Sequence, residues 1–210
     1  MFTGIVEQIG VIRQIRDWGG TNQIRIENPF GFEEIKLGDS VSCNGICLTI
    51  FEKSGKDFEV EIMHETLEKT TAKSWIAGQR LNLERAMPAE GRFDGHIVQG
   101  HVDTVGRILS MQKIEQTMYL EISFDAEFSS LLVPQGSVAV NGMSLTIAEL
   151  KERSFKVALI GFTITNTNIS DHRVGDEVNL EFDILGKYVQ RQLNRKDSKI
   201  TESWLHEQGF

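Results

Sequence analysis

One short phrase occurs twice in this chain, and the repetition limits the possible folds more than any other feature. Residues 44–50 read NGICLTI and residues 141–147 read NGMSLTI. Between the two copies a thiol, Cys47, is replaced by a hydroxyl, Ser144. At this offset of 97, the longer stretches 40–50 and 137–147 agree at seven of eleven positions.

The agreement extends along most of the chain. At offset 97 the tripeptide NLE at residues 82–84 returns at 179–181, and Thr66 pairs with Thr163. An offset of 96 aligns TGIVEQIGVI, which begins at Thr3, with QGHVDTVGRI, which begins at Gln99. The change of offset indicates a one-residue insertion or deletion between matching blocks. Repetition over this length predicts two like domains in tandem, at residues 1–96 and 97–186.

Each unit has the pattern of an all-β domain. Short runs rich in Val, Ile, Thr and Phe are separated by turn signals such as WGG, KSGK, KLGD, VPQG and RVGD. Because closure removes exposed strand edges, this rhythm predicts two tandem Greek-key antiparallel β-barrels. Short helical turns are expected at HETLEKTTAKSW (64–75) and at its partner FTITNTNISDHR (162–173).

A helical tail is expected at residues 187–210. In KYVQRQLNRK, Tyr188, Val189 and Leu193 fall along one stripe of a helix. In Lys199–Phe210, Ile200, Trp204 and Leu205 form another stripe. Two terminal helices with apolar faces have little domain core to cover, so the tail is predicted to join subunits.

Composition excludes several classes of protein. The formal net charge is −8, which argues against a nucleic-acid partner because that footprint is basic. No apolar run approaches the ~20 residues of a membrane-spanning helix, so no membrane partner is expected. The N-terminal stretch has no basic segment and contains Glu7, unlike a secretory signal. A cytoplasmic protein is expected.

The two cysteines are not expected to form a disulfide. Cys43 and Cys47 fall in a run that favours a strand, where residues four apart lie about 13 Å from each other at ~3.3 Å per residue. That separation is too large for a disulfide and provides half of a metal site at best. His96 and His101, five residues apart, would point to opposite faces of a strand. No metal site is predicted.

Several motifs in order resemble riboflavin synthase along essentially the whole chain. They are MFTGIVE, NGICLT, GHIVQGHVD, NGMSLT and VNLEFDILGKYV. The resemblance implies a transferase that needs no cofactor and forms a homotrimer through its C-terminal helix. Two molecules of 6,7-dimethyl-8-ribityllumazine would bind per site, and one would donate a four-carbon unit to the other. The products would be riboflavin and 5-amino-6-(ribitylamino)uracil. An association with lumazine synthase is a further expectation of the resemblance.

This chemistry would explain the repeated phrase. A duplicated barrel supplies two similar pockets for two identical substrate molecules. Divergence between the copies would let one molecule act as donor and the other as acceptor. Residues shared by the copies should therefore hold the ring, and residues that differ should carry the asymmetry.

Three residues that differ between the copies are the catalytic candidates: Cys47, His101 and Ser144. Taken singly, such residues are more often packing or surface residues, but here they lie at the motif positions of the resemblance. His101, whose counterpart is Ile5, suits removal of a proton from the acidic 7-methyl group of the lumazine, because an unperturbed imidazole titrates near neutral pH, at about 6.5. Cys47 could add to ring carbon 7 as a thiolate, or Ser144 could orient a hydroxide there. The sequence leaves both open.

The segments that match the family's ligand-contacting stretches supply the substrate-binding candidates. They are Gly4, Ile5, Val6, Leu48, Thr49, Glu61, Ile62, Met63, His64, Glu65, Thr66, Gly100, Val102, Gln135, Leu145, Thr146, Ala158, Leu159, Ile160, Gly161, Phe162 and Thr163. Phe2, Ser40 and Asp183 are additional candidates, and Asp183 also fits the start of a helix. The glycines at 45 and 142 are expected to allow a bulge or a close backbone approach.

The chain departs from the family pattern at two places. Gln135 occupies a position where the family usually has lysine, which removes a cation that would bind the anionic form of the substrate. LIGFT in the second copy lacks the proline that commonly follows its isoleucine.

Two other functions compete with the enzyme. A non-catalytic antenna protein that binds lumazine or flavin has the same fold, but such relatives lose the thiol and the histidine that Cys47 and His101 retain here. A flavin-binding reductase domain would require a nucleotide-binding unit, and no G-x-G-x-x-G fingerprint after a strand is present.

Overall fold

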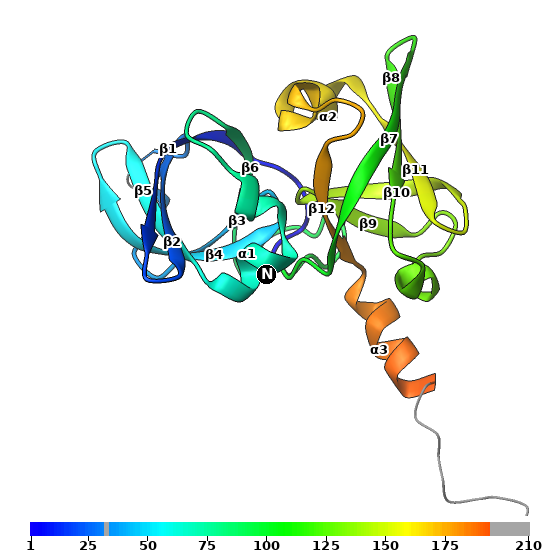
Figure 1. Cartoon of the computed structure of the whole chain (residues 1–210), viewed down its shortest axis with the longest axis horizontal. Helices are drawn as coiled ribbons and strands as arrows, with labels where there is room; N and C mark the ends of the chain where they lie inside the picture. The colour runs from blue at the N-terminus through cyan, green and yellow to red at the C-terminus, as the bar shows by residue number, and fades with distance from the viewer. Residues whose placement is uncertain (32–33, 194–210) are drawn as a thin grey trace, which may run out of the picture.

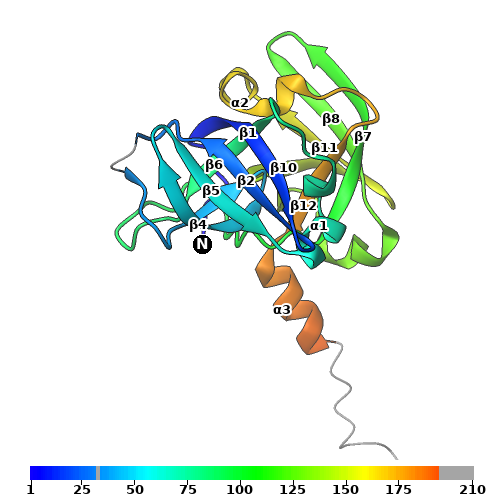
Figure 2. The same ribbon diagram turned by 60° about the vertical axis from the view of Figure 1, so that its left-hand side comes forward.

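Two β-barrels lie side by side, and a helix runs away from both of them (Figures 1 and 2). The computed structural model describes residues 1–31 and 34–193. Within these ranges, no helix has both the length and the apolar character needed to cross a membrane.

The first barrel closes six antiparallel strands in the order β1-β2-β5-β4-β3-β6. The strands are β1 (Gln8–Trp18), β2 (Thr21–Glu27), β3 (Ser40–Cys43), β4 (Ile46–Ser54), β5 (Asp57–Ile62) and β6 (Arg80–Arg85). Closure leaves no free edge on the barrel.

The second barrel repeats the same cyclic order, as β10-β11-β8-β7-β12-β9. Its strands are β7 (Thr104–Ile114), β8 (Thr117–Ser123), β9 (Ser137–Val140), β10 (Met143–Leu150), β11 (Ser154–Leu159) and β12 (Glu177–Phe182). The prediction of two tandem antiparallel barrels is confirmed. The change of offset falls between β2 and β3, where the second copy contains a 3₁₀ helix, η3 (Ala126–Leu131).

Alternation of side chains along the strands gives each barrel its own apolar core. On β2, Ile24 and Ile26 are fully buried, and on β8 the equivalent Leu120 and Ile122 are fully buried as well. The residues between them are more exposed because successive side chains of a strand point to opposite faces.

The helical turns also follow the sequence pattern. The first copy has α1 (His64–Lys69) and η2 (Thr71–Ser74), and the second has α2 (Gly161–Asn166) and η4 (Asn168–Asp171). In each copy a threonine, Thr70 or Thr167, caps the 3₁₀ turn by accepting a backbone N–H with its hydroxyl.

The C-terminal helix begins earlier than the sequence indicated. Helix α3 spans Ile184–Leu193, rather than starting after Gly186, because the Asp183 carboxylate accepts the Leu185 N–H at 2.9 Å and starts the first turn. The second predicted helix, Lys199–Phe210, lies outside the described residues.

The two cysteines lie on different strands of a hairpin, which corrects the expectation of one continuous strand. Asn44 and Gly45 have φ of 47° and 80° and form the two-residue turn between β3 and β4. Asn-Gly favours this turn because both residues tolerate positive φ. Cys43 therefore points into the barrel core, while Cys47 is only half-buried.

The turns of the two copies meet where the barrels join. A Cβ atom on Gly45 would lie 2.8 Å from the Gly142 nitrogen, so the expected close backbone approach is confirmed, at a turn rather than at a bulge. Side-chain amides cross the junction: Asn82 Nδ2 donates to the Asn141 carbonyl at 3.0 Å, and Asn179 Nδ2 donates to the Asn44 carbonyl at 2.9 Å. Satisfied buried amides fix the two barrels against each other.

Candidate active site

The first candidate site is a cavity of about 200 Å³ at the outer side of β4. Strand β4 provides Cys47, helix α1 provides Glu65 and Thr66, and the segment before β7 provides Gly100 and His101. The last segment belongs to the second repeat, so the cavity is built from both halves of the chain. Two of the three catalytic candidates, Cys47 and His101, line this cavity together.

A backbone hydrogen bond holds the two halves in contact. The Cys47 N–H donates to the Gly100 carbonyl at 2.9 Å. Gly100 has φ of +80°, and a Cβ atom there would lie 2.5 Å from the Cys47 Cβ. Both the positive φ and the missing side chain are therefore required for this approach.

The second candidate site repeats the arrangement with the halves exchanged. The Ser144 N–H on β10 donates to the Gly4 carbonyl, in the segment before β1, at 2.8 Å. Gly4 has φ of +78°, and its Cβ would lie 2.6 Å from the Ser144 Cβ. Ser144 thus occupies a different site from Cys47 and His101.

A histidine outside the sequence-based candidates completes the second site. His96 Nδ1 lies 2.7 Å from the Ser144 hydroxyl oxygen. His96 comes from the segment that connects the barrels, which occurs once in the chain, so the comparison of repeats passed over it. Its signal was present in the GHIVQGHVD motif. His96 and His101 do not lie on one strand as expected; they reach two different sites.

Burial controls the protonation of His96. His96 is only 7% exposed, and its Nε2 has no hydrogen-bond partner within residues 1–31 and 34–193. Desolvation lowers the pKa of His96, and the nearby negative charge of Asp183 opposes this shift. Neutral imidazole with its proton on Nε2 leaves Nδ1 free to accept the Ser144 hydroxyl proton.

The first site has no equivalent pair. Within the described ranges, no histidine nitrogen hydrogen-bonds to the Cys47 sulfur, and His101 is exposed at the cavity. Cys43, the other thiol, is fully buried, and burial raises its pKa. Cys47 is therefore the accessible thiol of the two.

Many of the substrate-binding candidates flank the two sites but differ in exposure. Four aliphatic side chains point into the barrel cores and leave only their backbone groups for a ligand: Leu48, Ile62, Leu145 and Leu159. Exposed or half-exposed positions on or beside the equivalent strands and helices are Ile5, Val6, Thr49, Glu61, Met63, His64, Glu65, Thr66, Val102, Thr146, Ala158, Ile160, Gly161, Phe162 and Thr163.

The helices beside the two sites differ in charge. Helix α1 carries Glu65, Glu68 and Lys69, with Lys69 Nζ 2.6 Å from a Glu65 oxygen. Helix α2 has no charged residue in its first or last turn and exposes Phe162 at 71%. Gln135 lies in the turn before β9 with φ of +64°, where the first copy has Gly38.

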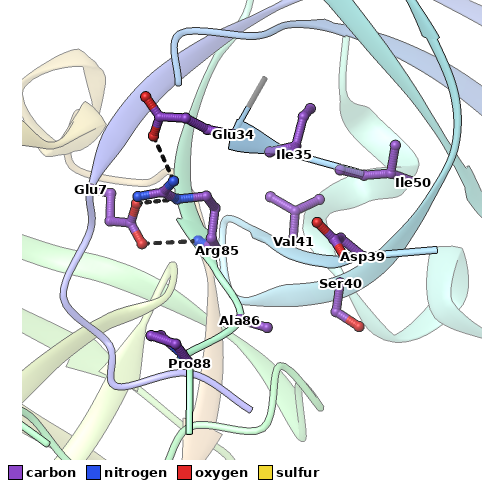
Figure 3. Close-up of a pocket in the computed structure, with 10 residues that line it drawn as sticks. All are labelled: Glu7, Glu34, Ile35, Asp39, Ser40, Val41, Ile50, Arg85, Ala86 and Pro88. Atoms are coloured by element: carbon purple, nitrogen blue, oxygen red, sulfur yellow. Dashed lines mark hydrogen bonds and ion pairs between the residues drawn. The ribbon is translucent and has the colours of Figure 1, made fainter. Parts of the chain in front are cut away.

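The remaining candidates do not line the first cavity. Phe2 is fully buried between the barrels, in a backbone bridge with Val98. Ser40 lines a separate cavity of about 300 Å³, where Arg85 contacts the carboxylates of Glu7 and Glu34 (Figure 3). Within the described part of the chain, no three His, Cys, Asp or Glu side chains are grouped to hold a metal ion.

Comparison with known proteins gives a consistent result. The lumazine binding domain model matches residues 3–86 and again 99–183. Riboflavin synthase of Bacillus subtilis is 39% identical over 215 residues, covering 100% of both chains. Riboflavin synthase of Saccharomyces cerevisiae is 36% identical, covering 95% of this chain and 92% of its own. Among solved structures, LumP complexed with riboflavin superposes with a TM-score of 0.81 at 24% identity, over 87% of this chain and 99% of its own.

Proposed function

This chain belongs to the riboflavin synthase family, and from that premise we propose how its two sites divide the reaction. The enzyme converts two molecules of 6,7-dimethyl-8-ribityllumazine into riboflavin and 5-amino-6-(ribitylamino)uracil by transfer of a four-carbon unit. The antenna alternative has less support, because the LumP structures share only the fold at 23–24% identity.

One observation carries the proposal. Ser144 has an imidazole nitrogen 2.7 Å from its hydroxyl oxygen, whereas Cys47, at the equivalent position, has none among the residues that the structure describes. A thiol with an ordinary pKa of about 8.5 forms some thiolate unaided near neutral pH, but a hydroxyl needs a base beside it. Cys47 is therefore suited to act as a thiolate nucleophile, and Ser144 to act as a hydroxyl activated by a neighbouring base.

The first site supplies the nucleophile. The Cys47 thiolate adds to ring carbon 7 of the lumazine bound beside it and makes that molecule a target for carbon–carbon bond formation. His101 lines the same cavity and is exposed to a molecule that stacks on the first. It carries protons between the two substrate molecules.

The second site supplies the carbanion. The Ser144 oxygen takes a proton from the 7-methyl group of its lumazine while its own proton passes to His96 Nδ1. Because burial keeps His96 neutral, this base is available at neutral pH. The negative charge of Asp183 stabilises the imidazolium that forms.

The reaction requires the two sites to face each other, which we assign to a homotrimer. Helix α3 points away from both barrels and exposes Leu185, Tyr188, Val189 and Leu193 at 58–80% (Figure 1). An apolar face of this kind is suited to contacts between copies of the chain. In this arrangement the division of the chain is two ligand-binding barrels, 1–96 and 97–186, followed by an association segment, 187–210.

Proton exchange tests the division of labour without requiring product formation. In D₂O, exchange of the 7-methyl protons is followed by NMR, and riboflavin formation is followed by absorbance. We expect Cys47→Ser to keep the exchange and lose riboflavin formation, and His96→Gln to lose both. Full exchange in the His96→Gln protein would exclude the Ser144–His96 pair as the base.

A further inference from the structure

Two buried carboxylates take no part in the chemistry described above. Glu84 at the end of β6 and Glu181 at the end of β12 are 5% and 2% exposed. They are equivalent residues of the repeated tripeptide NLE. Within residues 1–31 and 34–193, neither carboxylate is within ion-pair distance of a cationic side chain.

Each carboxylate instead accepts hydrogen bonds from consecutive backbone N–H groups. Glu181 Oε1 accepts from Gln99 at 2.7 Å, and its Oε2 accepts from Gly100 at 2.9 Å and from His101 at 3.1 Å. Successive N–H groups around a residue with positive φ form a concave anion site, and here the anion is part of the chain.

Glu84 makes the equivalent contacts in the first repeat. Its Oε1 accepts from the Thr3 N–H at 2.6 Å and from the Thr3 hydroxyl at 2.8 Å, and its Oε2 accepts from the Gly4 N–H at 3.0 Å. Burial raises the pKa of both carboxyl groups, and the N–H donors oppose that shift. The geometry matches the ionised form, because five of the six contacts come from backbone N–H groups, and an N–H needs an acceptor.

The segments held in this way belong to the opposite sites. Glu181 lies in the second barrel, yet the Gly100 segment that it holds forms the wall of the Cys47 site in the first barrel. Glu84 lies in the first barrel, and its Gly4 segment forms the wall of the Ser144 site in the second. The glutamate that holds each wall therefore lies in the barrel that does not contain the site.

We propose that Glu181 is the positioning residue for the Gly100–His101 wall of the first site, and Glu84 for the Gly4–Ile5 wall of the second. Each barrel thereby sets the shape of the ligand site in the other. This rests on the proposed function only for the statement that the two sites bind the lumazine.

The rate at which the Cys47 thiol is labelled measures how closely the Gly100–His101 wall covers it. The Cys47 backbone and Cβ lie against Gly100, Cys47 lines the open cavity, and Cys43 is fully buried. An aromatic disulfide reagent should therefore label Cys47 in the folded, full-length protein. Glu181→Gln replaces one of the two acceptor oxygens by an NH₂ group, which donates and cannot accept a backbone N–H. We expect labelling to accelerate at least fivefold in Glu181→Gln and less than twofold in Glu84→Gln.

A matched control separates positioning from general destabilisation. Glu59 on β5 is also buried, at 6% exposed, but it binds the Arg25 guanidinium away from both sites. Glu59→Gln should leave Cys47 labelling within twofold of the unmodified protein. Equal acceleration in Glu181→Gln, Glu84→Gln and Glu59→Gln would overturn the proposal, as would an unchanged rate in Glu181→Gln.

A second substitution and a ligand-protection measurement complete the experiment. If Glu181→Gln does not fold, Glu181→Asp is labelled instead, because it keeps the charge but shortens the side chain by one methylene. We again expect labelling to accelerate at least fivefold, and an unchanged rate would overturn the proposal. In the unmodified protein, saturating 6,7-dimethyl-8-ribityllumazine should slow labelling. If it does not, the assignment of the ligand site fails, while the contrast between Glu181→Gln and Glu84→Gln still decides the positioning role.

Discussion

The Ser144 hydroxyl oxygen lies 2.7 Å from Nδ1 of the buried His96. These residues are 48 positions apart in the chain and come from strand β10 and from the segment that connects the barrels. The duplication produced two equivalent positions, and this contact makes them chemically different. The thiol of the first copy and the hydroxyl–imidazole pair of the second are two ways to obtain a reactive group near neutral pH.

The first prediction concerns the thiol. Cys47→Ser should lower turnover at least tenfold, about 1.4 kcal/mol of transition-state stabilisation, because a hydroxyl without a neighbouring base does not ionise. Lumazine affinity should change little because the side chain keeps nearly the same size. Turnover and equilibrium binding are measured separately.

Cys43→Ser is the matched control for this change. Cys43 is fully buried in the core, so the hydroxyl should cost about 1–3 kcal/mol of folding stability while activity per folded molecule stays near normal. If Cys47→Ser behaves like Cys43→Ser, Cys47 is a packing residue.

The second prediction concerns the glycine beside the thiol. Gly100→Ala should strain the backbone at φ of +80° and push a methyl group to 2.5 Å from the Cys47 Cβ. We expect a loss of about 2–4 kcal/mol in unfolding free energy, from the left-handed backbone and from overpacking together. Unfolding in denaturant measures this loss of unfolding free energy.

Gly78→Ala separates these two contributions. Gly78 has φ of +88° and nothing within 4 Å of an added Cβ, so only the backbone cost of about 1–2 kcal/mol applies. Equal losses at the two positions would show that the contact between Gly100 and Cys47 is not tight.

The third prediction concerns acid sensitivity at the junction of the barrels. His172 Nε2 lies 3.2 Å from Asn141 Nδ2, and burial lowers its pKa, with Asp176 and Asp171 opposing the shift. In the unfolded chain the ordinary pKa is about 6.5, so the unfolded state binds the proton more readily. The contribution of His172 to the unfolding free energy is therefore fully present above the unfolded-state pKa. It is lost as pH falls through the lower pKa of the folded state.

Replacing His172 should therefore flatten the dependence of stability on pH. We expect the unfolding free energy of His172→Gln to fall less between pH 7.5 and pH 5.5 than that of the unmodified protein. Urea unfolding at both pH values gives the comparison, and the difference between the proteins cancels the contribution of Glu84, Glu181 and other groups. Parallel curves would contradict a role for His172.

The fourth prediction concerns the C-terminal segment. Removal of residues 187–210 deletes most of the apolar face of α3, including Tyr188, Val189 and Leu193. We expect monomers by light scattering, with folded barrels and turnover reduced at least tenfold, because the sites of different copies no longer meet. A monomeric chain with full turnover would place the complete reaction within one copy.

Much of the fold could be predicted because its pattern is local and repeated. Alternating burial on β2 and β8, the turn signals and the helical stretches at 64–75 and 162–173 depend on neighbours along the chain. The close approach of Gly45 and Gly142 was also indicated by their place in the repeated phrase. The Asn-Gly hairpin turn was missed, although the dipeptide itself favours such a turn.

The repeat by itself determined that this protein has two like barrels with two equivalent candidate sites, and which positions differ between them. Only the tertiary structure decided that each site borrows its wall from the other half, that Glu84 and Glu181 hold these walls, and that His96 reaches Ser144. Periodicity determines which face a side chain occupies, but a contact between residues 48 or 80 positions apart depends on how each barrel closes and on how the two barrels pack. That packing is set by the buried amides and glycines of the junction, and their partners become visible only when both barrels are in place.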